Sequence, residues 1–492
     1  MVFVSAECAP WSKTGGLGDV AGALPKALAA RGHRVMCVAP RYANYPEGWE
    51  TGVRLRLKVC GSDVEVGFFH GFIDGVDFVF VDHPCFHAHA KNIYGGGRDE
   101  LQFRCALLCS AALEAPRRVP CGGVTYGEDN LVFMANDWHT ALLPVFLQAH
   151  YRDHGQMTYA RCVLVLHNVA HQGRGPLADF NRLGLPGHWK DAFKLDDPVG
   201  GVCCNFLKAG LIAAHKLVAV SEGYALEIAT DMGGWGLAHT LRQQGAKLVG
   251  VANGIDEAEW DPATDPFLKG DGYALYARTD ADWAASKAAC KAALQKELGL
   301  PVKPATPLVG FIGRLDYQKG VDLITESGDH IVGNGVQLVL LGSGTVPLEN
   351  ALRALEGRHR DAARGWVGFS VAMSHRITAG VDILLMPSRF EPCGLNQMYA
   401  MRYGTVPVVH AVGGLRDTVQ QFNPFEDVGT GWTFSPADAG HMNEALFNAV
   451  RTYRDFPATF RGIQQRGMAQ DLSWERAAQK YEDVMLGAKY TW

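Results

Sequence analysis

The sequence predicts an α/β protein made of two Rossmann-like domains. Short, fully apolar runs alternate with helical patterns, which is typical of a parallel sheet covered by helices on both faces. The alternation starts again in the second half, after an acidic stretch at 257–266 and an alanine- and lysine-rich helix at 279–298. The chain has 492 residues, more than one core usually supports. Two facing domains of this kind place a cleft between two rows of strand ends.

The expected elements follow from the period of the apolar residues. Strands are expected in the first half at 2–4, 35–39, 64–69, 78–81, 131–135, 163–166, 216–220 and 248–251, with helices at 20–30, 101–115, 140–150 and 205–214. The second half repeats the pattern with strands at 308–312, 336–341 and 383–386, each followed by a helix, and a strand at 406–410 followed by Gly413 and Gly414. It ends in a helix at 473–488 capped by Ser473. We expect a first domain at 1–258, a second at 259–470, and a terminal helix at 471–492 that packs back on the first.

Composition excludes several classes of protein. The net charge of −5 gives no reason to expect a nucleic-acid partner. No apolar run reaches the roughly 18 residues of a membrane span, and no signal or transit peptide is expected before the first strand. Twelve cysteines without paired CxxC spacing predict free thiols in a reducing compartment. Without an HExxH or EF-hand motif either, we expect no metal.

A glycine-rich loop follows the first strand and leads into a helix. It reads Lys13-Thr-Gly-Gly-Leu-Gly-Asp-Val20. Three glycines in four positions allow a close approach between the backbone and a ligand, and the helix N-terminus behind them favours an anion. Lys13 adds a mobile positive charge. The loop therefore predicts contact with a phosphate-bearing ligand.

In the second half, two loops after strands carry charged residues. Arg314 and Lys319 lie between the strand at 308–312 and its helix, where two cations suit a diphosphate, although a solvated surface pair is the alternative. Glu391 follows the strand at 383–386; its carboxylate is able to accept hydrogen bonds from sugar hydroxyls, or it is only a charge at a helix N-terminus. Because both loops lie at the carboxyl edge of a parallel sheet, a ligand site is expected there.

Two loops of the first half are expected at the same edge as Lys13. Asp137, Trp138 and His139 follow one strand, and His167 follows the next. Trp138 is suited either to pack under the loop or to stack on a sugar.

The two-domain architecture alone fits a nucleotide-sugar glycosyltransferase, a periplasmic-type binding protein or a two-domain dehydrogenase. The sequence lacks GxGxxG and GxxxxGK[ST], which disfavours nicotinamide and ATPase chemistry and leaves a metal-independent diphosphate site.

Taken together, these motifs resemble the starch and bacterial glycogen synthases. The resemblance covers the whole chain. Within the family, the sequence is most similar to the plant and green-algal class-two soluble starch synthases. The segments that carry it are 13–20, 137–139, 167–176, 197–201, 313–320, 375–380, 387–395 and 413–418. It implies a glycosyltransferase of the B-type fold (GT-B), with the active site in the interdomain cleft. The implied reaction transfers glucose from ADP-glucose to the non-reducing 4-OH of an α-1,4-glucan, with retention, and needs no cofactor.

The resemblance also implies roles for individual residues. Lys13, Asp137, His167 and Glu391 are expected at the reacting sugar. ADP-glucose is expected to contact Lys13, Gly16, Asp19, Asn253, Arg314, Lys319, Phe369, Glu391, Cys393, Gly394, Leu395 and Thr418. Some retaining families place a second glutamate eight positions after the first, but here that position is Tyr399.

Localisation in the plastid stroma and complexes with other starch-biosynthetic enzymes are expectations from the resemblance alone. A bacterial-type glycogen synthase is the alternative within the same class. A non-catalytic glucan-binding scaffold is the remote alternative, because it would require a broken motif.

Overall fold

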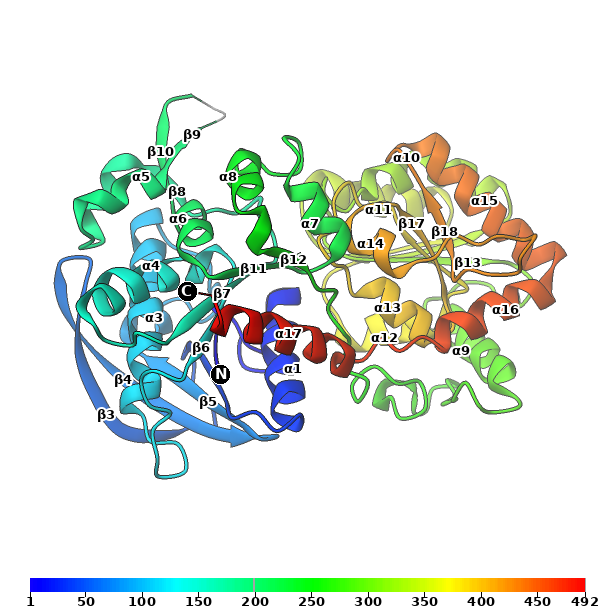
Figure 1. Ribbon diagram of the computed structural model, residues 1–492. Helices are drawn as coiled ribbons and strands as arrows, with labels where there is room; N and C mark the ends of the chain where they lie inside the picture. Colours follow the sequence, from blue (N-terminus) through cyan, green and yellow to red (C-terminus); the bar gives the residue numbers. More distant parts are fainter. Residues whose placement is uncertain (198–199, 492) are drawn as a thin grey trace. The chain divides into compact units, whose positions relative to one another are not determined.

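The computed structural model describes residues 1–197 and 200–491, which form two compact units (Figure 1). The first comprises Met1–Gly254 and Trp474–Trp492, and the second comprises Ile255–Ser473. Where the chain passes between units, its outgoing and returning segments run side by side, since Ile255 N–H donates to the Leu472 carbonyl (2.8 Å). Across the described ranges, no helix has the length and apolar character needed to cross a membrane.

The first unit is built on a nine-stranded sheet. Its order is β12-β11-β7-β6-β1-β2-β5-β4-β3, and the seven strands from β12 to β5 run parallel to one another. The strands are β1 (Val2–Val4), β2 (Val35–Pro40), β3 (Trp49–Val59), β4 (Ser62–Ile73), β5 (Val76–Asp82), β6 (Val132–Asn136), β7 (Arg161–Leu166), β11 (Lys216–Ala219) and β12 (Leu248–Gly250).

The expectation of a parallel sheet is wrong at one edge of this unit. Strands β3 and β4 are antiparallel, forming a hairpin that continues into β5. Strand β3 alternates polar and apolar residues, so one of its faces meets solvent, and it does not resemble a buried strand. A second small sheet joins β8 (Arg174–Pro176), β10 (Val202–Asn205) and β9 (Lys194–Asp196). In the segment 197–201, Pro198 and Val199 lie outside the described residues.

Helices flank the sheet of the first unit. They are α1 (Gly16–Ala30), α2 (Pro84–His87), α3 (Arg98–Arg118), α4 (Leu142–Phe146), α5 (Lys190–Phe193), α6 (Phe206–Ala213), α7 (Glu222–Ile228), α8 (Ala238–Gln243) and α17 (Trp474–Lys489). The single helix expected at 140–150 is instead a 3₁₀ turn (Trp138–Thr140), α4 and a π-helical turn (Leu147–Tyr151).

The terminal helix α17 belongs to the first unit, and Figure 1 shows it beside α1. Arg31 at the end of α1 binds Glu475 and Glu482, the second at 2.6 Å. Arg161 of β7 donates to the Thr491 carbonyl (2.9 Å). Just before the helix, the Ser473 hydroxyl donates to Asp471 (2.7 Å). Residues more than 300 positions apart in sequence therefore complete this unit.

The second unit contains a six-stranded sheet in which every neighbouring pair is parallel. Its order is β15-β14-β13-β16-β17-β18. The strands are β13 (Leu308–Ile312), β14 (Gln337–Gly342), β15 (Ala363–Val367), β16 (Ile383–Met386), β17 (Val406–His410) and β18 (Trp432–Phe434). The helices are α9 (Trp283–Glu297), α10 (Val321–Gly333), α11 (Val346–Arg358), α12 (Val371–Gly380), α13 (Asn396–Arg402), α14 (Gly413–Thr418), α15 (Ala439–Asp455) and α16 (Pro457–Met468).

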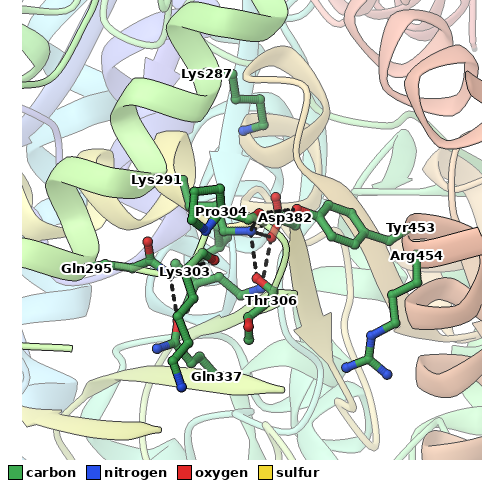
Figure 2. A network of polar contacts seen from close by, with 12 residues as sticks. Lys287, Lys291, Gln295, Lys303, Pro304, Thr306, Gln337, Asp382, Tyr453 and Arg454 are labelled. Atoms are coloured by element: carbon green, nitrogen blue, oxygen red, sulfur yellow. Dashed lines mark hydrogen bonds and ion pairs between the residues drawn. The ribbon is translucent and has the colours of Figure 1, made fainter. Parts of the chain in front are cut away.

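A buried polar network fixes the amino-terminal ends of β13 and β16 (Figure 2). The Lys291 ammonium of α9 pairs with Asp382 (2.7 Å) and donates to the carbonyls of Pro304 and Thr306 and to the Tyr453 hydroxyl. One turn earlier, the Lys287 ammonium donates to the Ala379 carbonyl (2.9 Å) and to Thr405 (2.7 Å). The network therefore joins α9, β13, β16 and α15 at the edge opposite the motif loops.

Candidate functional site

In the first unit, the loops after β1, β6 and β7 carry the motif residues. These three strands are adjacent and parallel, so their carboxyl ends meet at one edge of the sheet. The glycine-rich loop, Asp137 and His167 lie at that edge. The structure thus brings together the three first-half segments singled out in the sequence, which we call the first-unit loop cluster.

The glycine-rich loop is shaped by a buried carboxylate. Glu7 accepts hydrogen bonds from the backbone N–H (2.6 Å) and the hydroxyl (2.7 Å) of Thr14, and its burial raises its pKa. Helix α1 begins at Gly16. A Cβ at Gly18 would lie only 3.2 Å from the Lys13 Cα, so this glycine permits the loop to fold tightly over the helix.

Lys13 and Asp19 pair with one another. Their Nζ and Oδ1 atoms are 2.6 Å apart, and the side chains are 42% and 21% exposed. Because the ammonium is partly exposed, a phosphate is able to compete with Asp19 for it. Asp19 is then placed to hold the lysine beside the loop when no anion is present.

Asp137 occupies a strained and buried position. Its φ of 62° is unusual for a residue other than glycine, and its side chain is 6% exposed. The carboxylate accepts the backbone N–H groups of His167 and Asn168, each at 3.2 Å. Burial nevertheless raises the pKa of Asp137 to about 7. The carboxyl therefore lies near its midpoint of ionisation at neutral pH, directly against the start of the His167 loop.

The His167 ring is neutral and held in one orientation. Burial lowers its pKa to about 3. Its Nε2 lies 2.9 Å from the Asn136 side-chain oxygen, whose amide nitrogen donates to the Val4 and Met134 carbonyls. Because that oxygen only accepts, Nε2 carries the ring proton. The neighbouring strands β1 and β6 thereby fix the ring.

Asn253 follows β12, which runs parallel to β11 in the same sheet. It is 8% exposed, and its side-chain oxygen has no hydrogen-bond partner among the described residues. An unsatisfied buried amide oxygen costs roughly 1–3 kcal/mol. Such an atom is a candidate acceptor for a ligand hydroxyl.

In the second unit, Lys319 and Glu391 form a close ion pair across two loops. The distance between Nζ and Oε2 is 2.5 Å, and the Ser388 hydroxyl donates to the same carboxylate oxygen (3.0 Å). Their side chains are 21% and 7% exposed. The loops follow the adjacent strands β13 and β16. We call Lys319, Glu391 and Ser388 the second-unit ion-pair cluster.

The loop after β13 also places Arg314 at this edge. Its guanidinium is 61% exposed and binds Asp316 (2.9 Å) and Gln318 (2.9 Å). Exposure and a rigid fork of donors suit it to a diphosphate. Gly320 closes the loop with a φ of 67°, and a Cβ there would collide with the Pro387 carbonyl at 2.1 Å. The two loops therefore pack too closely for any residue but glycine.

Other predicted donor contacts lie on neighbouring loops of the same sheet. Phe369, after β15, is 84% exposed, which leaves its ring available for stacking. Cys393 is buried, Gly394 has a φ of 70°, and Leu395 precedes α13. The Thr418 hydroxyl donates to the Gly414 carbonyl (2.6 Å) and accepts from Gln397 (3.1 Å). That hydroxyl thus has two partners within the protein.

Sequence reasoning missed two residues that shape the site. Glu7 and Ser388 hold motif residues through hydrogen bonds, and both lie within or beside motifs, which was the available signal. Tyr399, where a second carboxylate is absent, stacks on Trp260 with ring centroids 3.8 Å apart. It is 7% exposed and belongs to the packing of the second unit.

Comparisons with known proteins define the class first and then the family. Residues 1–243 match the model of the starch synthase catalytic domain, and residues 306–451 match that of the group 1 glycosyl transferases. The structure resembles sucrose-phosphate synthase from Thermosynechococcus elongatus in fold (TM-score 0.59, 16% identity, 98% of this chain and 97% of that one). It also resembles the catalytic domain of starch synthase IV from Arabidopsis thaliana bound to ADP and acarbose (TM-score 0.87, 32% identity, 99% of both chains). The fold is that of the GT-B glycosyltransferases, as expected.

Sequence relatives identify the family within that class. Starch synthase 2 of Arabidopsis thaliana is 60% identical over all of this chain and 62% of its own length. Soluble starch synthase 2-2 of Oryza sativa is 58% identical over all of this chain and 71% of its own length. The chain belongs to the starch synthase family, and the expected likeness to class-two members is confirmed. It spans less than two thirds of the first three relatives, 62–65% of each.

Proposed function

We propose that this chain is a retaining glucosyltransferase that moves glucose from ADP-glucose to the non-reducing 4-OH of an α-1,4-glucan. It thereby elongates amylopectin-type chains. The observation that carries the proposal is the second-unit ion-pair cluster. It offers an ammonium for a phosphate and a shielded carboxylate for sugar hydroxyls, side by side at the carboxyl edge of the sheet.

Donor binding exchanges the partners of this cluster. A diphosphate is a strong competitor for Lys319, because phosphate oxygens form charge-assisted hydrogen bonds with ammonium and guanidinium groups. Once Lys319 turns to phosphate, Glu391 accepts hydroxyls of the glucose, still held by Ser388. Arg314 takes a second phosphate oxygen, and the Phe369 ring stacks on the base. Backbone at Cys393, Gly394 and Leu395 and the region of Thr418 complete the donor contacts.

The first-unit loop cluster contributes groups for the reacting sugar. Lys13 leaves Asp19 to bind the donor beside Gly16, and Asn253 supplies its unsatisfied oxygen to a hydroxyl. Asp137 accepts a sugar hydroxyl and holds the start of the His167 loop through two backbone N–H groups. The neutral His167 adds no positive charge near a sugar that develops oxocarbenium character.

The chemistry needs no metal or cofactor on this proposal. Negative charge that develops on the departing ADP is stabilised by Arg314, Lys319 and Lys13. We favour attack on the same face as the leaving phosphate over a covalent glycosyl-enzyme, because the motif residues offer no well-placed nucleophile pair and Tyr399 stands where some retaining families carry a second glutamate. Relatives named chloroplastic/amyloplastic support a plastid location for the whole protein. The starch synthase IV catalytic domain bound to ADP and acarbose supports a nucleotide and a glucan-like ligand for this chain. Complexes with other starch-biosynthetic enzymes stay a prediction.

The test measures glucose transfer from ADP-glucose and UDP-glucose, each with and without a glucan primer. Transfer is expected from ADP-glucose only in the presence of primer, and the product linkage is expected to be α by NMR. Glu391→Ala and Lys319→Ala are expected to lower kcat by about 10²-fold or more, since each removes a group from the charged site.

Lys296→Ala, at the exposed end of α9, is the matched control and should leave kcat unchanged. If both cluster variants kept full kcat, the site assignment would be wrong. Absence of turnover on every primer would favour a non-catalytic glucan-binding role, and a clear preference for glycogen over amylopectin would favour the glycogen synthase alternative.

A further inference from the structure

Among the residues that the structure describes, one group of potential metal ligands lies away from the motif loops. It consists of His70, Asp77 and Cys121, which we call the His70 cluster. One ligand atom from each lies within 4.8 Å of the other two, and all three residues are buried, at 3%, 7% and 3% exposure. They come from β4, β5 and the segment after α3. A buried imidazole, carboxylate and thiol at this spacing are a ligand set typical of Zn²⁺.

The surrounding structure holds each ligand in place. His70 Nε2 lies 2.7 Å from one oxygen of Asp77, and the Tyr126 hydroxyl donates to the other (2.6 Å). Cys121 opens a two-glycine turn, where Gly122 and Gly123 have φ values of 63° and 82°. The carbonyls of this turn bind Arg34, including that of Cys121 at 3.1 Å.

The cluster lies at the edge of the sheet opposite the first-unit loop cluster. Asp77 pairs in register with Met36 near the beginning of β2, whereas the motif loops follow the carboxyl ends of parallel strands. A ligand held here contacts none of the proposed donor groups. It acts on the stability of the β4–β5 hairpin and of the segment that follows α3.

We propose that the His70 cluster binds one Zn²⁺ ion through His70 Nε2, Asp77 Oδ1 and Cys121 Sγ. The ion enters between Nε2 and Oδ1, which now share a hydrogen bond. The Cys121 thiol loses its proton to solvent, and the His70 ring proton moves to Nδ1, so the ligands carry two negative charges that balance the ion. A water molecule completes a tetrahedral shell, and the Tyr126 hydroxyl keeps Asp77 oriented as an outer partner.

The ligand set argues against other common ions. Mg²⁺ and Ca²⁺ prefer six or more oxygen ligands, and this cluster offers one carboxylate. Thiolate and imidazole together favour Zn²⁺, with Co²⁺ as a spectroscopic substitute of the same geometry. The proposal is independent of the metal-free transfer reaction proposed above, because the two sites occupy opposite edges of the sheet.

The experiment titrates Co²⁺ and then Zn²⁺ into the chelator-treated protein. Co²⁺ is expected to produce a thiolate-to-cobalt charge-transfer band and tetrahedral ligand-field bands that saturate at one equivalent. Zn²⁺ is expected to abolish them and to raise Tm. No thiolate band in the wild-type protein, or no rise in Tm with Zn²⁺, overturns the proposal and leaves a hydrogen-bonded His–Asp–Tyr network.

Variants assign the site to these residues. Cys121→Ser is expected to lose the thiolate band and the Zn²⁺-dependent rise in Tm, while it retains glucosyl transfer at the wild-type kcat. Cys85→Ser, which removes a half-buried thiol on α2, is the matched control and should keep both metal responses. His70→Gln tests the second ligand in a protein that retains all its thiols. A thiolate band that survives in Cys121→Ser places the metal elsewhere and overturns the assignment.

Discussion

At the scale of single residues, Asp137 shows a conflict between stability and chemistry. It is held at a positive φ and buried, yet two backbone N–H groups point at its carboxylate. Desolvation outweighs those hydrogen bonds, so the pKa is raised from 3.8 to about 7. A charge kept in such a position at the cost of stability is typical of a functional site.

Asp137→Asn is predicted to stabilise the protein at pH 8 while it lowers activity. A carboxyl whose folded pKa is raised destabilises the folded state as pH rises from about 4 to about 7, and the penalty then stays constant. Asparagine retains an acceptor for both N–H groups without the charge. The difference in unfolding free energy is expected to be on the order of 2 kcal/mol at pH 8 and much smaller at pH 4, where the folded form of each protein is uncharged at this position.

Urea unfolding at the two pH values, alongside kcat, measures these effects. Burial is the main cause of the raised pKa of Asp137, and the nearby Glu7 carboxylate adds to it, so Glu7→Gln alone is the comparison that separates the two causes. A stability difference that is equal at pH 4 and pH 8 would contradict the predicted ionisation.

Among the elements, the buried lysines of α9 offer a matched pair one helical turn apart. Lys291 has Asp382 as a counter-ion, and its pKa is raised by that partner against the effect of burial. Lys287 donates to two neutral oxygens, the Ala379 carbonyl and the Thr405 hydroxyl, and burial lowers its pKa to about 8. The same residue type therefore contributes differently at the two positions.

Lys291→Met is predicted to cost about 3–5 kcal/mol of unfolding free energy, because it leaves the buried Asp382 carboxylate without its cation. Lys287→Met is predicted to cost less than about 1 kcal/mol at pH 7, since it removes a charge that burial already disfavours. Equilibrium denaturation of both variants tests the contrast. Equal losses would show that Asp382 does not distinguish the two lysines.

Element prediction succeeded where strands are buried on both faces. Strands β13, β16 and β17 have the expected bounds, because continuous apolar runs mark them plainly. Strand β3 alternates Arg54, Arg56 and Lys58 with apolar residues, and β15 contains Arg364 and Trp366, so neither resembles such a run. The sequence therefore predicts no strand at either place, and it assigns the strands at 64–69 and 78–81 to a parallel sheet although β4 runs antiparallel to both β3 and β5.

The sequence predicts which loops carry the candidate site, but it does not predict which side chains within those loops contact one another. Strand ends and glycines placed Lys13, Asp137, His167, Lys319 and Glu391 on the correct edges of their sheets. The Lys319–Glu391 pair joins residues 72 positions apart, and its geometry depends on the crossing of two loops at Gly320. No local pattern encodes that distance, nor the tautomer of His167, which rests on an asparagine of the neighbouring strand.

At the scale of the whole molecule, the first unit is completed by residues from the end of the chain. Helix α17 buries Trp474, Tyr481 and Met485 against it and binds Arg31 through two carboxylates. Truncation after Ser473 is predicted to destabilise the first unit by at least about 5 kcal/mol, because it removes the apolar contacts that three large side chains make with that unit. The second unit retains its own core.

Hydrogen exchange resolves this effect by unit. Amides of α1 and β7 are expected to lose protection in the truncated chain, while those of β13, β14 and β16 keep theirs. Lys480→Ala, which removes only the exposed pair with Glu222, should change stability by less than about 1 kcal/mol. Unchanged protection of α1 after truncation would show that α17 is dispensable.

The passage of the chain between units at Gly254 and Trp474 also sets an order of assembly during synthesis. A ribosome completes residues 1–254, then makes the whole second unit, and only afterwards supplies α17. At roughly 5–20 residues per second, the nascent first unit waits on the order of 10 s or longer for its last helix. During that interval the contiguous second unit is free to fold, so the half that begins first is the half that is finished last.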